Sequence, residues 1–499
     1  MGIAFGPPAT FTRIRGNKGL GRSLALPIGR LGLSNAHTPS NFSGQYHEEL
    51  TDGDIAKSLQ AILLSRQTPQ ETPFSDASAH YRKAPPFRIA PESKWFIVLL
   101  AMIVTLPSFS IDSCLASLSN IGVSLHAPPA ATALVLSLFM MGFGCGQVIF
   151  GPLCDRFGRR PTLLLGCVLF TAASVGCAVA PSIESLVFWR FVQGAGSAAG
   201  SVITFAVIRD LFSGTTARAR FAYVNVVAMI APMIAPTLGG LIAAWAGWRA
   251  VFFFLAIGGT LLAIVISLSL EESIQFRNKR ALILNTLVAN YWRVLSHRIC
   301  RGYALVGGLS FGGLFAYVSG SAFVFIEVFK VDSHVYGGLF AVNAFCLAIG
   351  AFTSGRLATR GVSGRGLIIT GLVIGLISSA LLLVFAGGRI MTLTSTMPLL
   401  MLNTFAIGLL SPNVVHGIME PLPEIAGVAS SVFGGIRMMV GAIASELVAI
   451  LYRGTPMAMS ETMTLFAAAS LVAGCFLFLP AGRRGQKPEA GSQEPEFGS

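Results

Sequence analysis

From Trp95 onward the sequence alternates long apolar runs with short charged connections, and this alternation constrains the fold more than any other feature. Each run is close to the roughly 20 residues that a helix needs to cross a bilayer. Lipid offers no partner to backbone N–H and C=O groups, so such runs form helices. The predicted spans are 95–118, 130–150, 161–180, 183–211, 221–245, 251–270, 302–329, 335–352, 366–385, 393–415, 426–452 and 462–479. The sequence therefore predicts an all-α membrane protein with twelve transmembrane helices.

Composition supports a membrane protein and argues against several other classes. Only 11% of the residues are charged, against roughly 25% in soluble domains. The net charge of +13 would fit a nucleic-acid partner only if basic residues and aromatics shared one solvated face. Outside residues 1–94, Lys and Arg lie instead mostly in alternate short loops. We therefore expect no nucleic-acid partner. The sequence also lacks the Gly-rich loop that binds nucleotide phosphates, and its eight cysteines lack the spacing of a metal site, so we expect no cofactor and no metal.

The loop charges predict an orientation. With the amino terminus inside, the cytosolic loops hold fifteen Lys and Arg residues, whereas the outer loops hold four, which are Arg249, Lys330, Arg389 and Arg453. Basic residues collect on the cytoplasmic side of short loops. We therefore expect a multi-pass protein of the cell inner (cytoplasmic) membrane, with both termini in the cytosol and the lipid bilayer as its surroundings.

The chain divides into five predicted parts. Residues 1–93 are rich in Gly, Pro, Ser and Thr and are predicted to be a disordered cytosolic tail, with a transit peptide or an over-extended start as alternatives. The longest loop, 271–301, is predicted to be cytosolic and to separate two six-helix bundles, 94–270 and 302–480. Residues 481–499 form a second disordered tail. Two such halves place a substrate site at their interface, and rocking of one half against the other gives alternating access.

Four charged residues fall inside the predicted spans, where charge is costly and usually functional. Asp112 lies 17 residues after Trp95, about 26 Å along an outward-running helix. Arg190 lies about 10 Å below the outer surface, so the two side chains can face one cavity. Asp112 can gain a proton outside and lose it inside, or the pair can be a structural ion pair. Arg437, near mid-depth, can meet an anionic substrate group or a buried partner, whereas Glu446 is expected to be solvated.

The junction after the second span combines glycine with charge. Gly151 is expected to let the chain turn tightly, and Pro152 to restrict how it enters the turn. The pattern Gly-x-Leu-x-Asp-Arg-x-Gly-Arg-Arg resembles motif A of the major facilitator superfamily. A generic positively charged loop is the alternative. The resemblance implies a role in conformational gating for Gly151, Asp155, Arg156, Gly158, Arg159 and Arg160.

Two further stretches resemble motifs of the same superfamily. Arg190, Gln193, Gly194 and Gly196 match motif B, which implies that Arg190, with Gln193, takes part in proton coupling; a small-residue packing face is the alternative. The fifth span resembles motif C, the antiporter signature, although Ala231 and Ala235 replace glycines. An ordinary kinked helix is the alternative reading. The resemblance assigns Ala235, Pro236, Gly239 and Gly240 to this antiporter motif.

Together these features resemble the bicyclomycin-resistance (Bcr/CflA) branch of drug:proton antiporters. The first helix departs from that branch, because it keeps Asp112 but lacks the tyrosine and prolines that follow there. The resemblance implies a monomeric transporter, not an enzyme, with two pseudo-symmetric six-helix bundles. It would exchange protons for small, largely hydrophobic drugs by alternating access. The alternatives are an exporter or importer of an endogenous metabolite or siderophore, and a non-transporting membrane sensor or assembly factor.

Overall fold

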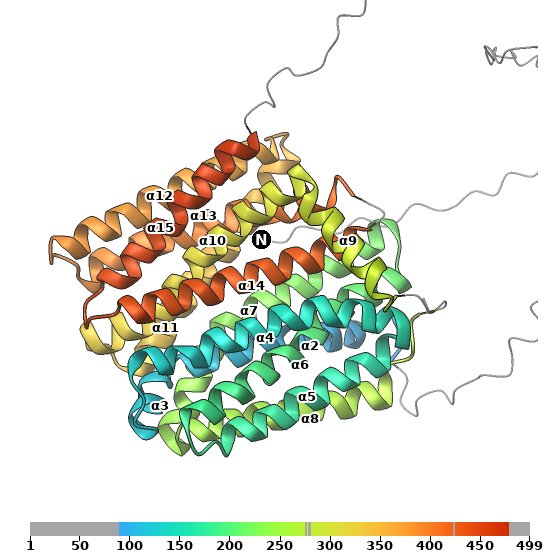
Figure 1. Ribbon diagram of the computed structural model, residues 1–499, viewed down its shortest axis with the longest axis horizontal. Coiled ribbons are helices and arrows are strands. Elements are labelled where there is room, and N and C mark those ends of the chain that lie inside the picture. The colour runs from blue at the N-terminus through green and yellow to red at the C-terminus, as the bar shows by residue number, and fades with distance from the viewer. Residues whose placement is uncertain (1–88, 275–276, 278–280, 423–424, 479–499) are drawn as a thin grey trace, which may run out of the picture. The chain divides into compact units, whose positions relative to one another are not determined.

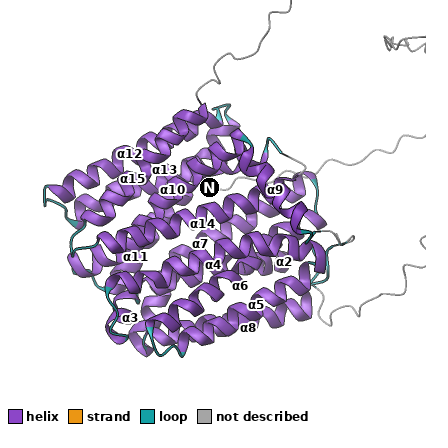
Figure 2. Cartoon of the chain, in the orientation of Figure 1, coloured by secondary structure: helices purple, strands orange, loops and turns teal. Residues whose placement is uncertain are grey.

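The structure is a computed structural model that describes residues 89–274, 277, 281–422 and 425–478. Helices make up nearly all of this part of the chain (Figure 2). The predicted tails, 1–93 and 481–499, lie outside the described residues apart from 89–93.

Twelve of the described helices are long and apolar enough to cross a membrane, which confirms the predicted number of spans. Their ends agree with the predicted ends to within a few residues, except where α4, α7 and α11 are longer. The twelve are α2 (Lys94–Leu115), α4 (Pro129–Phe157), α5 (Arg159–Ala178), α6 (Ile183–Leu211), α7 (Gly214–Ala246), α8 (Trp248–Ser269), α10 (Arg298–Ala322), α11 (Ser333–Thr359), α12 (Gly364–Gly387), α13 (Leu393–Met419), α14 (Ala426–Leu451) and α15 (Met457–Phe478).

Two short helices mark the two ends of the spanning helices. The α3 helix (Leu118–Ser124) follows α2, and the α9 helix (Leu284–Ser296) joins α8 to α10. Figure 1 shows α3 and α9 at opposite ends of the helices, and we call these the α3 end and the α9 end. The π-helical segment η2 (Phe323–Val328) continues α10 to the α3 end. The predicted loop 271–301 is not irregular throughout, because α9 occupies part of it.

The first six and last six spanning helices form two sets (Figure 1). In the first half, α6 packs on α4 and α5, α7 packs on α2, and α8 packs on α5. In the second half, α10 packs on α14 and α15, and α13 packs on α11 and α12. The halves meet through α4 against α14 and α7 against α11. This is the twelve-helix, two-bundle architecture that the sequence predicted.

The predicted turn at Gly151 is wrong. The α4 helix continues through Gly151 and Pro152 to Phe157, and the chain turns only at Gly158, whose φ of 108° is a conformation that favours glycine. Gly151 instead faces the second half, where an added Cβ atom would lie 3.6 Å from the hydroxyl of Ser431 in α14. Gly151 therefore serves the approach of the two halves rather than a turn.

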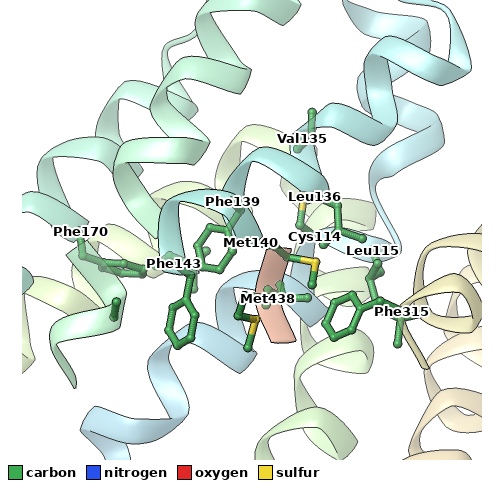
Figure 3. Packing of buried hydrophobic residues seen from close by; sticks show 14 of the residues in the cluster. Cys114, Leu115, Val135, Leu136, Phe139, Met140, Phe143, Phe170, Phe315 and Met438 are labelled. Carbon is green, nitrogen blue, oxygen red and sulfur yellow. The ribbon is translucent and has the colours of Figure 1, made fainter. Parts of the chain in front are cut away.

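The buried apolar cluster extends across both halves. Figure 3 shows side chains of α4 packed between residues of α2, α5, α10 and α14. Burying this surface stabilises the contact between helices within each half and the contact of α4 with α14. The labelled members are Cys114, Leu115, Val135, Leu136, Phe139, Met140, Phe143, Phe170, Phe315 and Met438.

Candidate functional site

Arg190 lies in α6 at the centre of the first half, and its side chain is 0% exposed. Its Nε donates to the carbonyl of Val135 at 2.9 Å, and its Nη1 donates to the hydroxyl of Ser110 at 2.9 Å. Nη1 also donates to Oε1 of Gln193 at 2.7 Å, and Gln193 donates in turn to Ser174 at 2.7 Å. One guanidinium thus connects α6 to α2 and α4, and Gln193 extends the connection to α5.

The charge of Arg190 is stabilised without a carboxylate. Its guanidinium lies 4.3 Å from the ring centre of Phe139 and 5.7 Å from that of Phe252. Aromatic faces attract a cation, most strongly where water is excluded. The remaining Nη2 has no hydrogen-bond partner in the described part of the chain. Arg190 is therefore held by carbonyl, hydroxyl, amide and ring groups.

Asp112 lies on the opposite face of α2 from Ser110, because two residues on a helix differ by about 200°. Its side chain is buried, at 6% exposed, and it forms no hydrogen bond or ion pair with any described residue. The carboxyl group is close enough to interact electrostatically with Tyr317 of α10 and Tyr336 of α11. Asp112 and Arg190 are therefore not paired: Arg190 binds within the first half, and Asp112 faces the second.

The motif C residues pack α7 directly against α2 beside Asp112. A Cβ atom at Gly239 would collide with the backbone of Ser113, so the two helices approach at backbone distance. Close approach of this kind requires small residues. All four predicted residues are buried, and they are Ala235, Pro236, Gly239 and Gly240.

The charged motif A residues lie at the α9 end and bind mainly within the first half. Arg159 donates to Asp155 at 2.5 Å and to Asp210 of α6 at 2.9 Å, and its backbone N–H donates to Glu272 at 2.8 Å. Arg160 donates to the carbonyl of Ser267 in α8 at 2.5 Å. The network fixes the α9 ends of α5, α6 and α8 around Gly158.

Arg156 behaves differently from the other two arginines of this stretch. Its side chain is exposed, and its guanidinium lies 5.5 Å from the ring centre of Phe157. An exposed contact between a cation and an aromatic ring contributes about 0.5–1 kcal/mol of interaction free energy. The structure therefore separates Arg156 from the buried network of Arg159.

Arg437 lies in α14 of the second half. Its guanidinium is 4.5 Å from the ring centre of Phe311 and 5.9 Å from that of Phe433. Its Nε atom is buried and has no partner among the described residues. Arg437 lines a small cavity of α10, α13 and α14 together with Ser310 and Ser411. The sequence predicted a buried charge here, and the structure surrounds it with aromatic rings and hydroxyl groups.

The sequence did not point to three uncharged polar residues of the second half, which are Tyr317, Tyr336 and Asn343. Tyr336, Phe340 and Asn343 recur at helical spacing on one face of α11, and the ring of Tyr317 stacks on Phe340 with 5.9 Å between centres. None of these residues is charged, so none stands out among the apolar residues of its span. Tyr and Asn at positions i and i+7 of an otherwise apolar helix are the signal that would have found them.

Two carboxylates join the halves at the α3 end. Ser137 of α4 donates to Glu446 of α14 at 3.0 Å, so the expectation that Glu446 is merely solvated is wrong. Ser119 of α3 donates to Glu327 of η2 at 3.0 Å, and Tyr452 donates to the same carboxylate at 2.9 Å. Burial raises the pKa of the Tyr452 hydroxyl, and the bond to Glu327 raises it further. Tyr452 therefore remains a hydrogen-bond donor.

Comparison with known proteins agrees with this arrangement. The profile of the Major Facilitator Superfamily matches residues 72–445. The chain is 34% identical over 356 residues to the uncharacterized MFS-type transporter YdgK of Bacillus subtilis, covering 70% of this chain and 88% of that protein. It is 30% identical over 390 residues to the bicyclomycin resistance protein homolog of Haemophilus influenzae, covering 77% and 96%. The solved xylose transporter XylE of E. coli shares the fold, with a TM-score of 0.59, 16% identity, and 78% and 98% coverage.

Proposed function

This chain belongs to the Major Facilitator Superfamily, in its bicyclomycin-resistance type, and we propose that it exports small, largely hydrophobic drugs or toxic compounds in exchange for protons. It is a transporter and not an enzyme. Drug resistance in the names of relatives supports the substrate class, for example the multidrug resistance protein D of E. coli, which is 25% identical over 384 residues and covers 76% of this chain and 94% of that protein. Alternating access by rocking of the two halves moves the substrate.

The observation that carries the proton coupling is the buried, unpaired carboxyl group of Asp112. A carboxylate without a partner in an apolar site is costly, whereas the protonated acid is not. Asp112 faces the second half, so separation of the halves at either end exposes it to water on that side. It would therefore take up a proton when open to the outside and release it when open to the cytosol.

Arg190 and Gln193 would act by positioning. Their bonds to Ser110 and Ser174 fix the rotation of α2, and that rotation directs Asp112 toward the second half. Arg437 would contact the substrate from α14, because its unpaired Nε suits an anionic or carbonyl group. The motif A network would hold the α9 end of the first half rigid while the halves rock.

We further propose that the protein acts as a monomer in the inner membrane, with the α9 end and both termini in the cytosol. Fifteen basic residues in the loops on that side support this orientation, against four on the other. The α3 end then faces outward, and the carboxylate contacts of Glu327 and Glu446 close the outer side.

The test is Asp112→Asn in inverted membrane vesicles. The variant keeps the size of the side chain but cannot exchange a proton at neutral pH, so export driven by an imposed pH gradient should fall to background. Asp332→Asn, at an exposed position before α11, is the matched control and should keep full activity. Gradient-driven export that survives in Asp112→Asn would refute the role of Asp112.

A further inference from the structure

Arg190 and Arg437 both lie inside spanning helices, but only Arg190 has hydrogen-bond acceptors. Arg190 donates to groups of α2, α4 and its own helix. The guanidinium of Arg437 forms no hydrogen bond or ion pair with any described residue, and its Nε atom is buried. Charge inside a spanning helix is costly and usually functional. Arg437 therefore carries a charge that the described part of the chain leaves unpaired.

The aromatic neighbours of Arg437 compensate only part of this charge. Its guanidinium lies 4.5 Å from the ring centre of Phe311 and 5.9 Å from that of Phe433. The attraction between a cation and a ring is smaller than the free energy needed to remove an unpaired ion from water. The rest of the charge requires an anion.

The acids of the second half that the structure describes do not supply this anion. Glu446 is the acid of α14, and it lies nine residues beyond Arg437, or about 14 Å along the helix axis. It accepts a hydrogen bond from Ser137 of the other half instead. Glu327 accepts its hydrogen bonds at the α3 end. Within the described part of the chain, only a bound anion can therefore neutralise Arg437.

Arg437 lines a cavity between α10, α13 and α14 whose volume is about 20 Å³. About 10–15 Å³ is enough for one water molecule, whereas drug-sized ligands occupy about 300 Å³ or more. The cavity therefore fits one small ion or one projecting group of a larger ligand. Ser411 also lines it, and its hydroxyl donates to the carbonyl of Ile407 in its own helix at 2.7 Å. Because a hydroxyl rotates, Ser411 can donate to a ligand in the cavity instead.

We propose that Arg437 binds a small monovalent anion, chloride or a halide of similar size, in this cavity. A guanidinium has only N–H donors, so its ligand must be an acceptor. Water would satisfy an N–H group but would leave the charge unpaired. The inference deepens the proposed contact of Arg437 with the substrate, because the anion would hold the place of a substrate group until the substrate displaces it.

The experiment measures thermal unfolding of the purified full chain in detergent, in sodium chloride and in sodium gluconate at equal concentration. Gluconate is too large for the cavity, so the comparison separates the site from a general effect of ionic strength. The melting temperature should rise with chloride along a saturating curve, by about 1–3 °C, because a ligand that binds only the folded state stabilises it. Arg437→Gln should abolish the difference between the two salts.

The matched control is Arg249→Gln. Arg249 also lies beside a ring, 4.2 Å from the ring centre of Trp248, but it donates to the carbonyl of Ala180 at 3.1 Å. This variant should keep the wild-type response to chloride. Arg437→Gln in gluconate should melt at the wild-type temperature or above it, because it removes an unpaired charge. A purely structural Arg437 would instead lower the melting temperature equally in both salts.

Chloride NMR gives a direct measurement of binding. Chloride that exchanges on and off the folded protein broadens the chloride line, and the wild type should broaden it more than Arg437→Gln at equal protein concentration. Equal line widths in the two proteins would overturn the site, and so would equal stabilisation of the wild type by chloride and gluconate.

Neither measurement needs transport, so the anion site and the proposed export fail separately. A wild type that responds to chloride but does not export would reject the proposed function and keep the site. Gradient-driven export by a protein whose melting temperature and chloride line width do not depend on Arg437 would do the reverse.

Discussion

Ser110 and Asp112 lie on opposite faces of α2, and only Ser110 is hydrogen-bonded to the rest of the first half. Ser110 accepts hydrogen bonds from Arg190 through its hydroxyl at 2.9 Å and through its carbonyl at 3.2 Å. Asp112 is within electrostatic range of Tyr317 and Tyr336 of the second half. A rotation of α2 that breaks the first contact also changes the second. The buried arginine and the buried acid are therefore linked by the geometry of one helix.

Arg190→Lys should lose both stability and coupling. Lysine keeps the charge but cannot reproduce the planar fork that reaches Val135, Ser110 and Gln193. Losing about two buried hydrogen bonds should cost about 2 kcal/mol or more, measured by thermal unfolding in detergent. Residual transport in vesicles should also no longer respond to the pH gradient, which a loss of stability alone would not cause. Arg249→Lys, a partly exposed matched change, should affect neither.

The sequence predicted the twelve spans because hydropathy is a local property. The depths that the helical rise gives for Asp112 and Arg190 stay predictions. The sequence did not predict that the two side chains face different halves. That depends on which neighbours α2 and α6 contact, and such contacts are set by small residues such as Gly239 on other helices.

Other parts of the site were missed for related reasons. Tyr317 and Asn343 hardly change the hydropathy of their spans, so a search for charges passes over them. Gly151 and Pro152 suggested a turn, but a helix tolerates both where neighbouring helices support it, and the turn falls at Gly158. The bonds of Ser119 to Glu327 and of Ser137 to Glu446 join residues more than 200 positions apart, which no local pattern reveals.

Gly434→Val should stop transport with little loss of stability. A Cβ atom at Gly434 would collide with the side-chain amide of Gln147, where α14 meets α4 of the other half. The larger residue should hold the halves apart and lower the export rate more than tenfold, while thermal unfolding changes little. Gly338→Val in α11 is the control, since a Cβ atom there meets nothing within 4 Å. Full export by Gly434→Val would show that this close approach is not needed.

Gly194→Val, in contrast to Gly434→Val, should lower the stability of the protein. A Cβ atom at Gly194 would meet the backbone carbonyl of Phe139, in the contact of α6 with α4 inside the first half. Backbone cannot move aside as a side chain can, so we expect a loss of stability of about 1–3 kcal/mol and low yield of folded protein. Thermal unfolding of the Gly194→Val and Gly434→Val proteins, measured side by side, separates a loss of stability from a loss of transport alone. A Gly194→Val protein as stable as wild type would contradict the packing described for α4 and α6.

Asp210→Asn should destabilise the α9 end more than Asp155→Asn. Both carboxylates bind Arg159, but Asp155 is half exposed, whereas Asp210 is more buried and also accepts a bond from Ser273 at 3.2 Å. Exposed ion pairs contribute about 0–1 kcal/mol, and hydrogen bonds to charged groups contribute about 1.5–3 kcal/mol. Thermal unfolding of both variants in one detergent gives the comparison. Equal losses of stability in the two variants would mean that Asp155 binds Arg159 as tightly as Asp210 does.

Ser119→Ala and Glu327→Ala should shift the protein toward a state that is open at the α3 end. Ser119 and Glu327 belong to different halves, and their 3.0 Å bond exists only while the halves are together there. Losing a hydrogen bond to a carboxylate, which contributes about 1.5–3 kcal/mol, should raise the open-to-closed ratio about tenfold or more, because 1.4 kcal/mol is a factor of ten. Spin labels at the exposed residues Val123 and Arg389, in a cysteine-free background, report the separation as a distance distribution. Ser267→Ala, which removes a bond within α8 only, is the control. An unchanged distance distribution in both variants would mean that the Ser119–Glu327 bond does not hold the outer side closed.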